Sequence, residues 1–215
     1  MLVSDVMTTN VVSIPSGTNL AEANHIMEAH HFRRIPVIDR GKLVGIVSKD
    51  ELDKSGPSKL TSFSIHEITY MLYKMTVDKI MKRDVVTAPP TMNVEQAVRL
   101  AQSKRVGALI VVEDGKVVGI CTTNDLFYRI CNPVLGIGMP GSRIVIRDCY
   151  KGPDIEKVIS TINKAGVCIL NLFVINLHLP DIDKHELIIH LDITDNNQVI
   201  EDISKLGFVT ENRLR

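Results

Sequence analysis

The sequence contains no tryptophan, and aromatic residues make up only 4% of its 215 positions. This scarcity argues against a platform on which single-stranded nucleic acid could stack its bases. Lysine plus arginine and aspartate plus glutamate both number 25, so there is no basic excess to attract nucleic acid or an acidic membrane over a long range. We therefore expect neither nucleic acid nor a membrane among the partners.

The sequence also lacks long apolar runs and cysteine motifs. No run reaches the roughly 20 residues of a membrane-spanning helix, and the first residues have neither the charged nor the apolar region of a signal peptide. A cytoplasmic protein is therefore expected. The cysteines form no C-x-x-C pair and have no histidine at zinc-finger spacing, so we predict that they are small, buried and reduced. They are Cys121, Cys131, Cys149 and Cys168.

Catalytic and metal-binding motifs are missing as well. There is no P-loop, no G-x-G-x-x-G and no nucleophile motif. Neighbouring residues on a helix point about 100 degrees apart, so His30 and His31 do not share one ion, and a solvated helix end is the simpler interpretation. His178, His185 and His190 lie near one predicted hairpin but match no zinc template, which favours surface or dimer contacts. We expect no metal and no enzymatic activity.

What the sequence does contain is a long internal repeat. The stretch Val44–Leu52, VGIVSKDEL, recurs 74 positions later as Val118–Leu126, VGICTTNDL. The same offset relates Met7 to Met81, and from there to the end of the repeated stretch the two copies align without a gap. A repeat of this length indicates a duplicated structural unit.

The pattern inside each copy predicts the order β-α-β-β-α. Val11–Ile14 is a β-branched run that ends at a proline-glycine turn, which is typical of a strand. Asn19, and Asn93 in the second copy, can cap the helix that follows. A hairpin with glycine in its turn comes next, and a helix begins near Glu51 or, in the second copy, Asp125, where a carboxylate suits the helix dipole.

The rest of the chain divides at two composition changes. Ser64–Glu67 looks like a capping box, and Ile65, Ile68, Leu72 and Met75 have helical spacing, so the first linker is predicted to be partly helical. A stretch rich in glycine and proline ends the repeat. The predicted parts are the first copy at 1–54, a linker at 55–77, the second copy at 78–133, a linker at 134–142 and a third domain at 143–215.

The third domain has a different pattern of predicted strands and helices. Arg143–Ile146 alternates as a strand, a helical stripe follows, two apolar strands come next, and a second helix near residues 197–205 precedes a last strand at Gly207–Thr210. The predicted order is βαββαβ, which is an antiparallel sheet with two helices on one face.

These residues carry a resemblance to known families. The duplicated unit resembles a pair of cystathionine-β-synthase (CBS) domains, whose most diagnostic stretch is G-h-h-[S/T]-x-x-[D/E]-L, where h is apolar. The third domain resembles an ACT domain, and the whole arrangement resembles the CBS–ACT proteins of acetoin-utilisation operons. The implied fold class is α+β, with a tandem CBS pair followed by a ferredoxin-like ACT domain.

The CBS resemblance implies a ligand and a set of site residues. In the family, clefts between the two copies bind adenosine-containing ligands, so AMP, ADP, ATP or S-adenosylmethionine is expected here. For the second copy it implies that Asp125 holds the ribose hydroxyls and Thr122 the phosphate, with adenine against Val86-Thr87 and Gly107-Ala108. The first-copy equivalents are Ser48, Glu51, Val12-Ser13 and Arg33-Arg34, with Arg34 a candidate phosphate partner.

Glu51 replaces the family's usual aspartate, and its extra methylene displaces the carboxylate, so the second-copy site is the better candidate. The alternative for Thr122 and Asp125 is a helix cap and a first-turn acid. Gly45 and Gly119 are interpreted as structural, since they allow close packing of the backbone.

The ACT resemblance implies dimerisation and an effector site at the turn between the first strand and helix. The family often has D-x-P-G there, and Asp148–Pro153 departs from that pattern. The expected function is a ligand-sensing regulatory protein that forms a homodimer and acts on a protein partner. The alternative is a ligand-free interaction or scaffold protein whose CBS clefts are degenerate.

Overall fold

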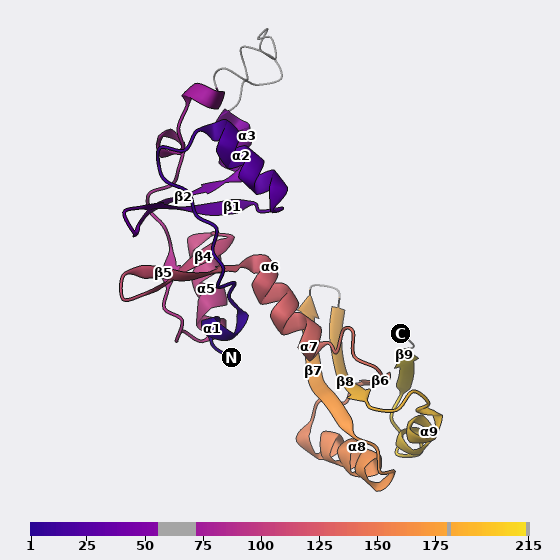
Figure 1. Ribbon diagram of the computed structural model, residues 1–215. Helices are drawn as coiled ribbons and strands as arrows, with labels where there is room; N and C mark the ends of the chain where they lie inside the picture. The colour runs from indigo at the N-terminus through magenta and orange to yellow at the C-terminus, as the bar shows by residue number, and fades with distance from the viewer. Residues whose placement is uncertain (56–71, 180–181, 214–215) are drawn as a thin grey trace. The chain divides into compact units, whose positions relative to one another are not determined.

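The structure is a computed structural model that describes residues 1–55, 72–179 and 182–213. The chain divides into two units, Met1–Tyr128 and Arg129–Arg215 (Figure 1). None of the helices in the described ranges has the length and apolar character that a bilayer crossing requires. Most of the predicted helix of the first linker falls outside the described residues, but residues 72–74 are helical.

The first copy of the repeat is built from local signals that the sequence shows. Asn19 caps its first helix by accepting a hydrogen bond from the Glu22 backbone N–H at 2.8 Å. Arg40 and Gly41 both have positive φ in the hairpin turn, as predicted for the glycine. Its elements are α1 (Val3–Val6), α2 (Leu20–Ala29), β1 (Arg34–Asp39), β2 (Lys42–Ser48) and α3 (Lys49–Ser55).

The second copy repeats this arrangement. Asn93 accepts from the Gln96 N–H at 2.8 Å, and Asp114 and Gly115 take positive φ in the turn. The elements are η1 (Val77–Lys79), β3 (Thr87–Ala88), α5 (Val94–Lys104), β4 (Ala108–Glu113), β5 (Lys116–Thr122) and α6 (Thr123–Leu126).

The strand predicted at Val11–Ile14 is wrong in extent, because only Ile14 forms a bridge, to Val37 of β1. In the second copy the Ile110 N–H donates to the Val86 carbonyl at 3.1 Å, and β3 pairs with β4 in parallel. The first-copy equivalent of Ile110 is Pro36, which has no N–H to donate. The ladder therefore cannot extend toward the start of the predicted strand.

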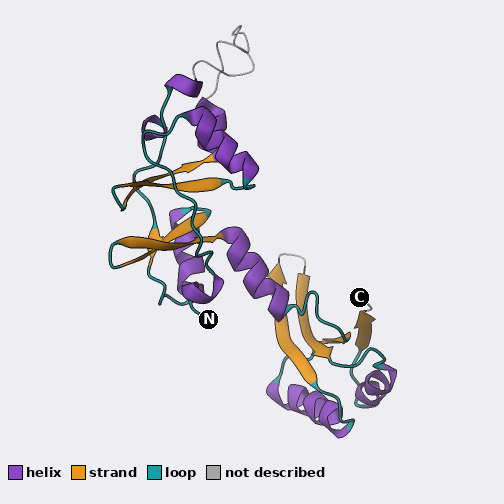
Figure 2. Ribbon diagram, viewed as in Figure 1, coloured by secondary structure: helices purple, strands orange, loops and turns teal. Residues whose placement is uncertain are grey.

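The C-terminal unit has the predicted βαββαβ order. Its four strands form an antiparallel sheet in the order β7-β8-β6-β9. Both long helices lie on one face of the sheet, over a core that includes Ile144, Ile189, Val158 and Ile203 (Figure 2). The unit begins within η2 (Phe127–Cys131). Its other elements are α7 (Asn132–Val134), β6 (Ser142–Arg147), α8 (Gly152–Lys164), β7 (Ile169–Leu179), β8 (Ile182–Leu191), α9 (Asn197–Lys205) and β9 (Thr210–Arg213).

The cysteine prediction holds for two of the four side chains. Cys121 and Cys149 are buried, and burial raises the pKa of the Cys149 thiol. Cys131 is half-buried and Cys168 is exposed, so these two are not core residues as predicted. Cys168 lies just before β7, and its backbone N–H donates to the Asp192 carboxylate at 3.0 Å.

Candidate nucleotide site between the two copies

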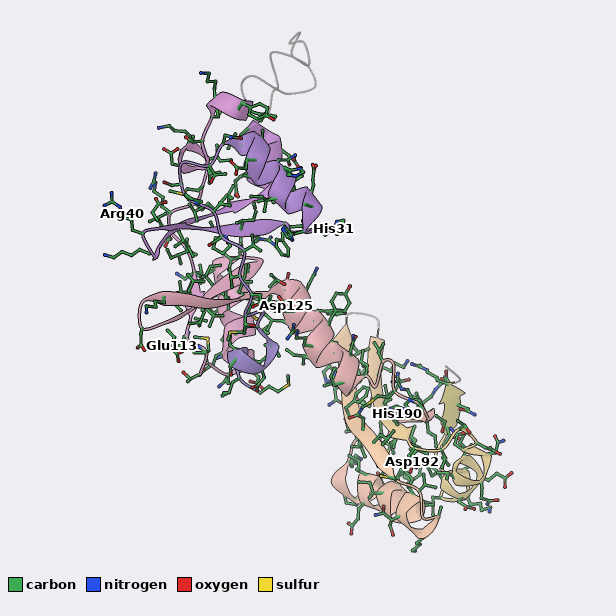
Figure 3. All side chains as sticks on the ribbon, viewed as in Figure 1. His31, Arg40, Glu113, Asp125, His190 and Asp192 are labelled. Atoms are coloured by element: carbon green, nitrogen blue, oxygen red, sulfur yellow. The ribbon has the colours of Figure 1, made fainter. Side chains whose placement is uncertain are left out.

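The N-terminal unit contains a cleft, here called cleft A, to which both copies contribute. The first copy supplies Thr8, residues 10–12 and His31–Arg34, and the second copy supplies Thr122–Asp125. The volume of cleft A is about 420 Å³, which lies within the roughly 300–1,000 Å³ of small-molecule sites. Figure 3 shows Asp125 at the start of α6 and His31 just after α2 on the same side of the unit.

A second cleft, cleft B, is built from the equivalent positions with the copies exchanged. The second copy supplies Lys82, residues 84–86 and Arg105–Ala108, and the first copy supplies Ser48 and Glu51. Its volume is about 270 Å³. The two clefts are thus related by the same 74-residue offset as the sequence repeat.

This exchange corrects the predicted grouping of site residues. Val86 and Gly107-Ala108 were expected beside Asp125, but they line cleft B with Ser48 and Glu51. Likewise, Val12 lines cleft A, and Arg34 lines both clefts.

The cause is a crossing of the chain between the copies. Thr8 and Ile120 exchange backbone hydrogen bonds of 2.9 and 3.0 Å, and Ile46 and Lys82 exchange two of 2.9 Å. The start of each copy therefore lies beside the second hairpin strand of the other. Ser13 and Thr87 line neither cleft and are exposed, because successive side chains of an extended segment point to opposite sides.

The structural role proposed for Gly45 and Gly119 is confirmed. A Cβ atom on Gly119 would lie 2.4 Å from Sδ of Met7, and one on Gly45 would lie 2.6 Å from Sδ of Met81. Each glycine therefore makes room for the methionine that precedes the crossing segment.

In cleft A, Asp125 is both a helix cap and an available acceptor. Its Oδ2 accepts hydrogen bonds from the Thr122 backbone N–H at 2.9 Å and from the Thr122 hydroxyl at 2.6 Å. Its Oδ1 accepts no hydrogen bond from the described part of the chain. The capping role is therefore real, and it leaves one carboxylate oxygen for a ligand.

In cleft B, the carboxylate of Glu51 is engaged on both oxygens. Oε2 accepts from the Ser48 N–H at 2.8 Å and from the Ser48 hydroxyl, while Oε1 pairs with the Lys82 ammonium at 2.9 Å. Burial raises the pKa of Glu51, but the hydrogen bonds from Ser48 and Lys82 outweigh it and hold the pKa below its ordinary value. The lysine thus occupies the oxygen that is available in Asp125.

Arg33 and Arg34 differ in whether they form an ion pair. Arg33 forms an exposed ion pair with Asp50 at 2.9 Å. Arg34 makes no ion pair within the residues that the structure describes, and its guanidinium lies against Gly107, where an added Cβ would be 2.4 Å from Nη2. Arg34 lines both clefts.

Sequence reasoning missed several residues of cleft A. Phe32 presents an aromatic side chain to the cleft with 37% of its surface exposed, and His31, with positive φ, precedes it. Thr8 and Asn10 complete the polar lining. No motif in the sequence marks them, but the repeat offset relates them to Arg105, Val106, Lys82 and Asp84, which line cleft B.

The duplicated unit matches known proteins in sequence and in fold. The model of the CBS domain matches residues 3–55 and 77–132. The structure of the CBS pair of protein MJ0100, in complex with 5-methylthioadenosine and S-adenosyl-L-methionine, is 26% identical with a TM-score of 0.51, and the match covers 61% of this chain and 97% of that chain. For a proposed acetoin-utilisation protein (AcuB) from Vibrio cholerae, the values are 28%, 0.53, 64% and 94%.

A curated relative is MJ1225 of Methanocaldococcus jannaschii, which is 29% identical over 131 residues that cover 58% of this chain and 45% of that protein. The chain spans only 23% to 45% of the length of the first three curated relatives that it matches. The family match nevertheless accounts for about half of this chain and falls on both copies of the repeat. The chain therefore belongs to the CBS domain family and carries two copies of the domain in tandem.

Proposed function

We propose that the protein is a ligand-sensing regulatory protein that binds one adenine nucleotide in cleft A. The observation that carries this proposal is Asp125, whose Oδ1 has no partner among the described residues while Oδ2 is held by Thr122. A carboxylate fixed in this way can accept hydrogen bonds from ribose hydroxyls without first losing a protein contact. Binding of methylthioadenosine and S-adenosylmethionine by the related MJ0100 pair supports the adenosyl class.

The charges around cleft A favour a phosphorylated ligand. Arg34, which lines cleft A and also cleft B, has no ion-pair partner in the described ranges, and a guanidinium matches phosphate geometry. Phe32 offers an aromatic surface for adenine. We therefore expect AMP, ADP or ATP to bind more tightly than S-adenosylmethionine, which carries a positive sulfonium group.

Cleft B is proposed to be weaker or empty. Binding of a ribose there would have to displace Lys82 from Glu51, and the cleft is smaller by about a third. One nucleotide per chain is therefore the expected stoichiometry. Bound nucleotide would shift the arrangement of the two copies only by its differential affinity for the alternative states.

Calorimetric titration of the full chain with AMP, ATP and S-adenosylmethionine tests the proposal. Asp125→Asn keeps an oxygen for the Thr122 cap but removes the charge, and a charge-assisted hydrogen bond contributes about 1.5–3 kcal/mol, so affinity should fall roughly 10- to 100-fold. Glu51→Gln is the matched control in cleft B and should leave affinity unchanged. No heat with any ligand, from protein shown to be folded, would contradict nucleotide sensing.

For the C-terminal unit we propose an ACT-like role in dimerisation and effector binding. The βαββαβ order and the sheet order support this assignment. Leu170 and Leu177 are exposed on the edge strand β7, where a second copy could pair. Sedimentation of the full chain should then give twice its 23.9 kDa mass.

The engaged carboxylate of Glu51 favours one alternative, in which the clefts have lost ligand and the protein serves as an interaction scaffold. The two functions differ in one readout. If the folded wild-type chain shows neither heat nor a thermal shift with any of the nucleotides, the scaffold is the better explanation.

A further inference from the structure

A cluster of two histidines and one aspartate lies on the β7–β8 hairpin, outside the nucleotide clefts. His178 faces Asp183 across the hairpin, and His185 faces Asn176 two positions along the same register. Alternation along the strands places all four side chains on one face of the sheet. One ligand atom from each of His178, Asp183 and His185 lies within 4.8 Å of the other two.

Asn176 sets the orientation of the most buried member. Nδ1 of His185 lies 2.8 Å from the Asn176 amide oxygen, and because that oxygen is an acceptor, the contact is a hydrogen bond in the tautomer whose proton is on Nδ1. In that neutral tautomer, Nε2 carries a lone pair and is an acceptor. It lies 3.5 Å from Oδ1 of Asp183. These two acceptors repel each other unless a proton, a water molecule or a metal ion lies between them, and a metal ion satisfies both at once.

The spacing suits a metal ion. Nδ1 of His178 lies 2.8 Å from the same Asp183 oxygen. In a tetrahedral site with metal–ligand bonds of about 2.0–2.1 Å, neighbouring ligand atoms are about 3.4 Å apart, a value between the two observed distances. His178 is 70% exposed and Asp183 74%, so both side chains can adjust, whereas His185 is only 18% exposed.

The loop between β6 and α8 holds His185 in place from a second side. The ring of Tyr150 stacks on the His185 ring with centroids 4.2 Å apart, and the Asp148 N–H donates to the His185 carbonyl at 2.8 Å. A hydrogen-bonded partner on the remote nitrogen and a packed ring are the supports that metal-binding histidines usually have.

We propose that His178, Asp183 and His185 bind a divalent first-row transition ion such as zinc, with Asn176 as a positioning residue. Two imidazoles and one carboxylate suit zinc, cobalt, nickel and copper rather than magnesium or calcium. Three protein ligands leave a coordination position open to water or to a small ligand. This proposal departs from the expectation of no metal. The sequence placed His178 and His185 near one hairpin with His190, but the hairpin register brings them to Asp183 instead.

Zinc titration of the full chain, without an affinity tag and after removal of metal by a chelator, tests the site. The wild-type chain should bind one zinc ion, and cobalt should give the visible absorption of a four-coordinate ion with nitrogen ligands. His178→Ala and His185→Ala should each lose at least tenfold in affinity. Asn176→Ala should lose about 10- to 100-fold, which is typical when the partner of a metal-binding histidine is removed.

Two matched controls exclude other donors. His30→Ala removes one of the two adjacent histidines, His30 and His31, of the first copy. Cys168→Ser removes the exposed thiol. Both variants should bind zinc as the wild type does. Absence of stoichiometric binding by the wild type would overturn the proposal, as would wild-type affinity in the folded His178→Ala and His185→Ala variants. Nucleotide affinity, measured in parallel, should be the same in His178→Ala, His185→Ala and Asn176→Ala as in the wild type.

Discussion

At the scale of single residues, one methylene separates the two capping carboxylates. Asp125 and Glu51 occupy equivalent positions and make the same contacts with Thr122 and Ser48. The longer side chain also reaches Lys82, whose equivalent in cleft A is the neutral Thr8. The difference between the clefts therefore arises from two substitutions, one at each end of the interaction.

The depressed pKa of Glu51 makes a prediction about stability. A carboxyl whose pKa is lower in the folded than in the unfolded chain stabilises the fold above its ordinary pKa, near 4.5, and loses that contribution as the pH falls through the folded value. Glu51→Gln keeps an oxygen for the Ser48 N–H but removes the charge that strengthens the contacts with Ser48 and Lys82, so it should cost about 1 kcal/mol at pH 7. The cost should shrink as the pH falls below 4.5, and urea unfolding at pH 7 and at lower pH measures it.

Asp50→Asn is the matched control for this experiment. Asp50 neighbours Glu51 and also pairs with a basic residue, but both partners of that pair are more than 60% exposed, and such pairs contribute about 0–1 kcal/mol. An equal loss in Asp50→Asn, or a Glu51→Gln effect that does not depend on pH, would show that the Lys82 and Ser48 contacts are not the cause.

At the scale of elements, local signals predicted what local chemistry determines. The caps at Asn19 and Asn93 and the turn at Gly41 depend on residues a few positions apart, and all three are present. The prediction of a strand over Val11–Ile14 was wrong in extent because its backbone hydrogen bonds depend on Pro36, a residue on another strand. Nonlocal pairing of this kind cannot be inferred from the run itself.

Nonlocal pairing also explains why the sequence predicted neither the composition of the clefts nor the histidine cluster. The repeat shows that two equivalent sites exist but not which copy faces which, and the crossing at Thr8 and Ile120 decides it. His178 and His185 meet Asp183 only in one hairpin register. Both features depend on register, which the alternation of apolar residues does not determine at polar strand ends.

The packing of each glycine against a methionine leads to a prediction about the crossing segments. Gly119→Ala would place a Cβ 2.4 Å from Sδ of Met7, and overpacking of this kind costs about 1–3 kcal/mol. Met7→Val removes the sulfur, so the double variant should recover part of the loss. Thermal unfolding of both single variants and the double variant measures the coupling.

The second copy of the motif provides the control. Gly45→Ala with Met81→Val should behave in the same way, because Sδ of Met81 lies 2.6 Å from the added Cβ. If the stability losses of the two single variants simply add in either double variant, the methionine is not what excludes a side chain from the glycine position.

At the scale of the whole molecule, two units with separate cores should unfold in two thermal transitions. The first copy and the C-terminal unit each have a core of their own, around Leu20 and Ile203 respectively. Leu20→Ala and Ile203→Ala remove fully buried side chains and should each cost about 2–5 kcal/mol. Each variant lowers one transition in scanning calorimetry, which identifies the unit that unfolds in it.

Ligands should then raise only the transition of the unit that binds them. A ligand at 100 times its dissociation constant stabilises the folded state by about 2.7 kcal/mol, which raises the transition temperature by several degrees. We expect AMP or ATP to raise the transition that Leu20→Ala lowers, and zinc to raise the one that Ile203→Ala lowers. The first shift should be lost in Asp125→Asn and the second in His185→Ala. A nucleotide shift of the Ile203 transition alone would place the nucleotide site outside the CBS pair, and a nucleotide shift that survives in Asp125→Asn would exclude cleft A.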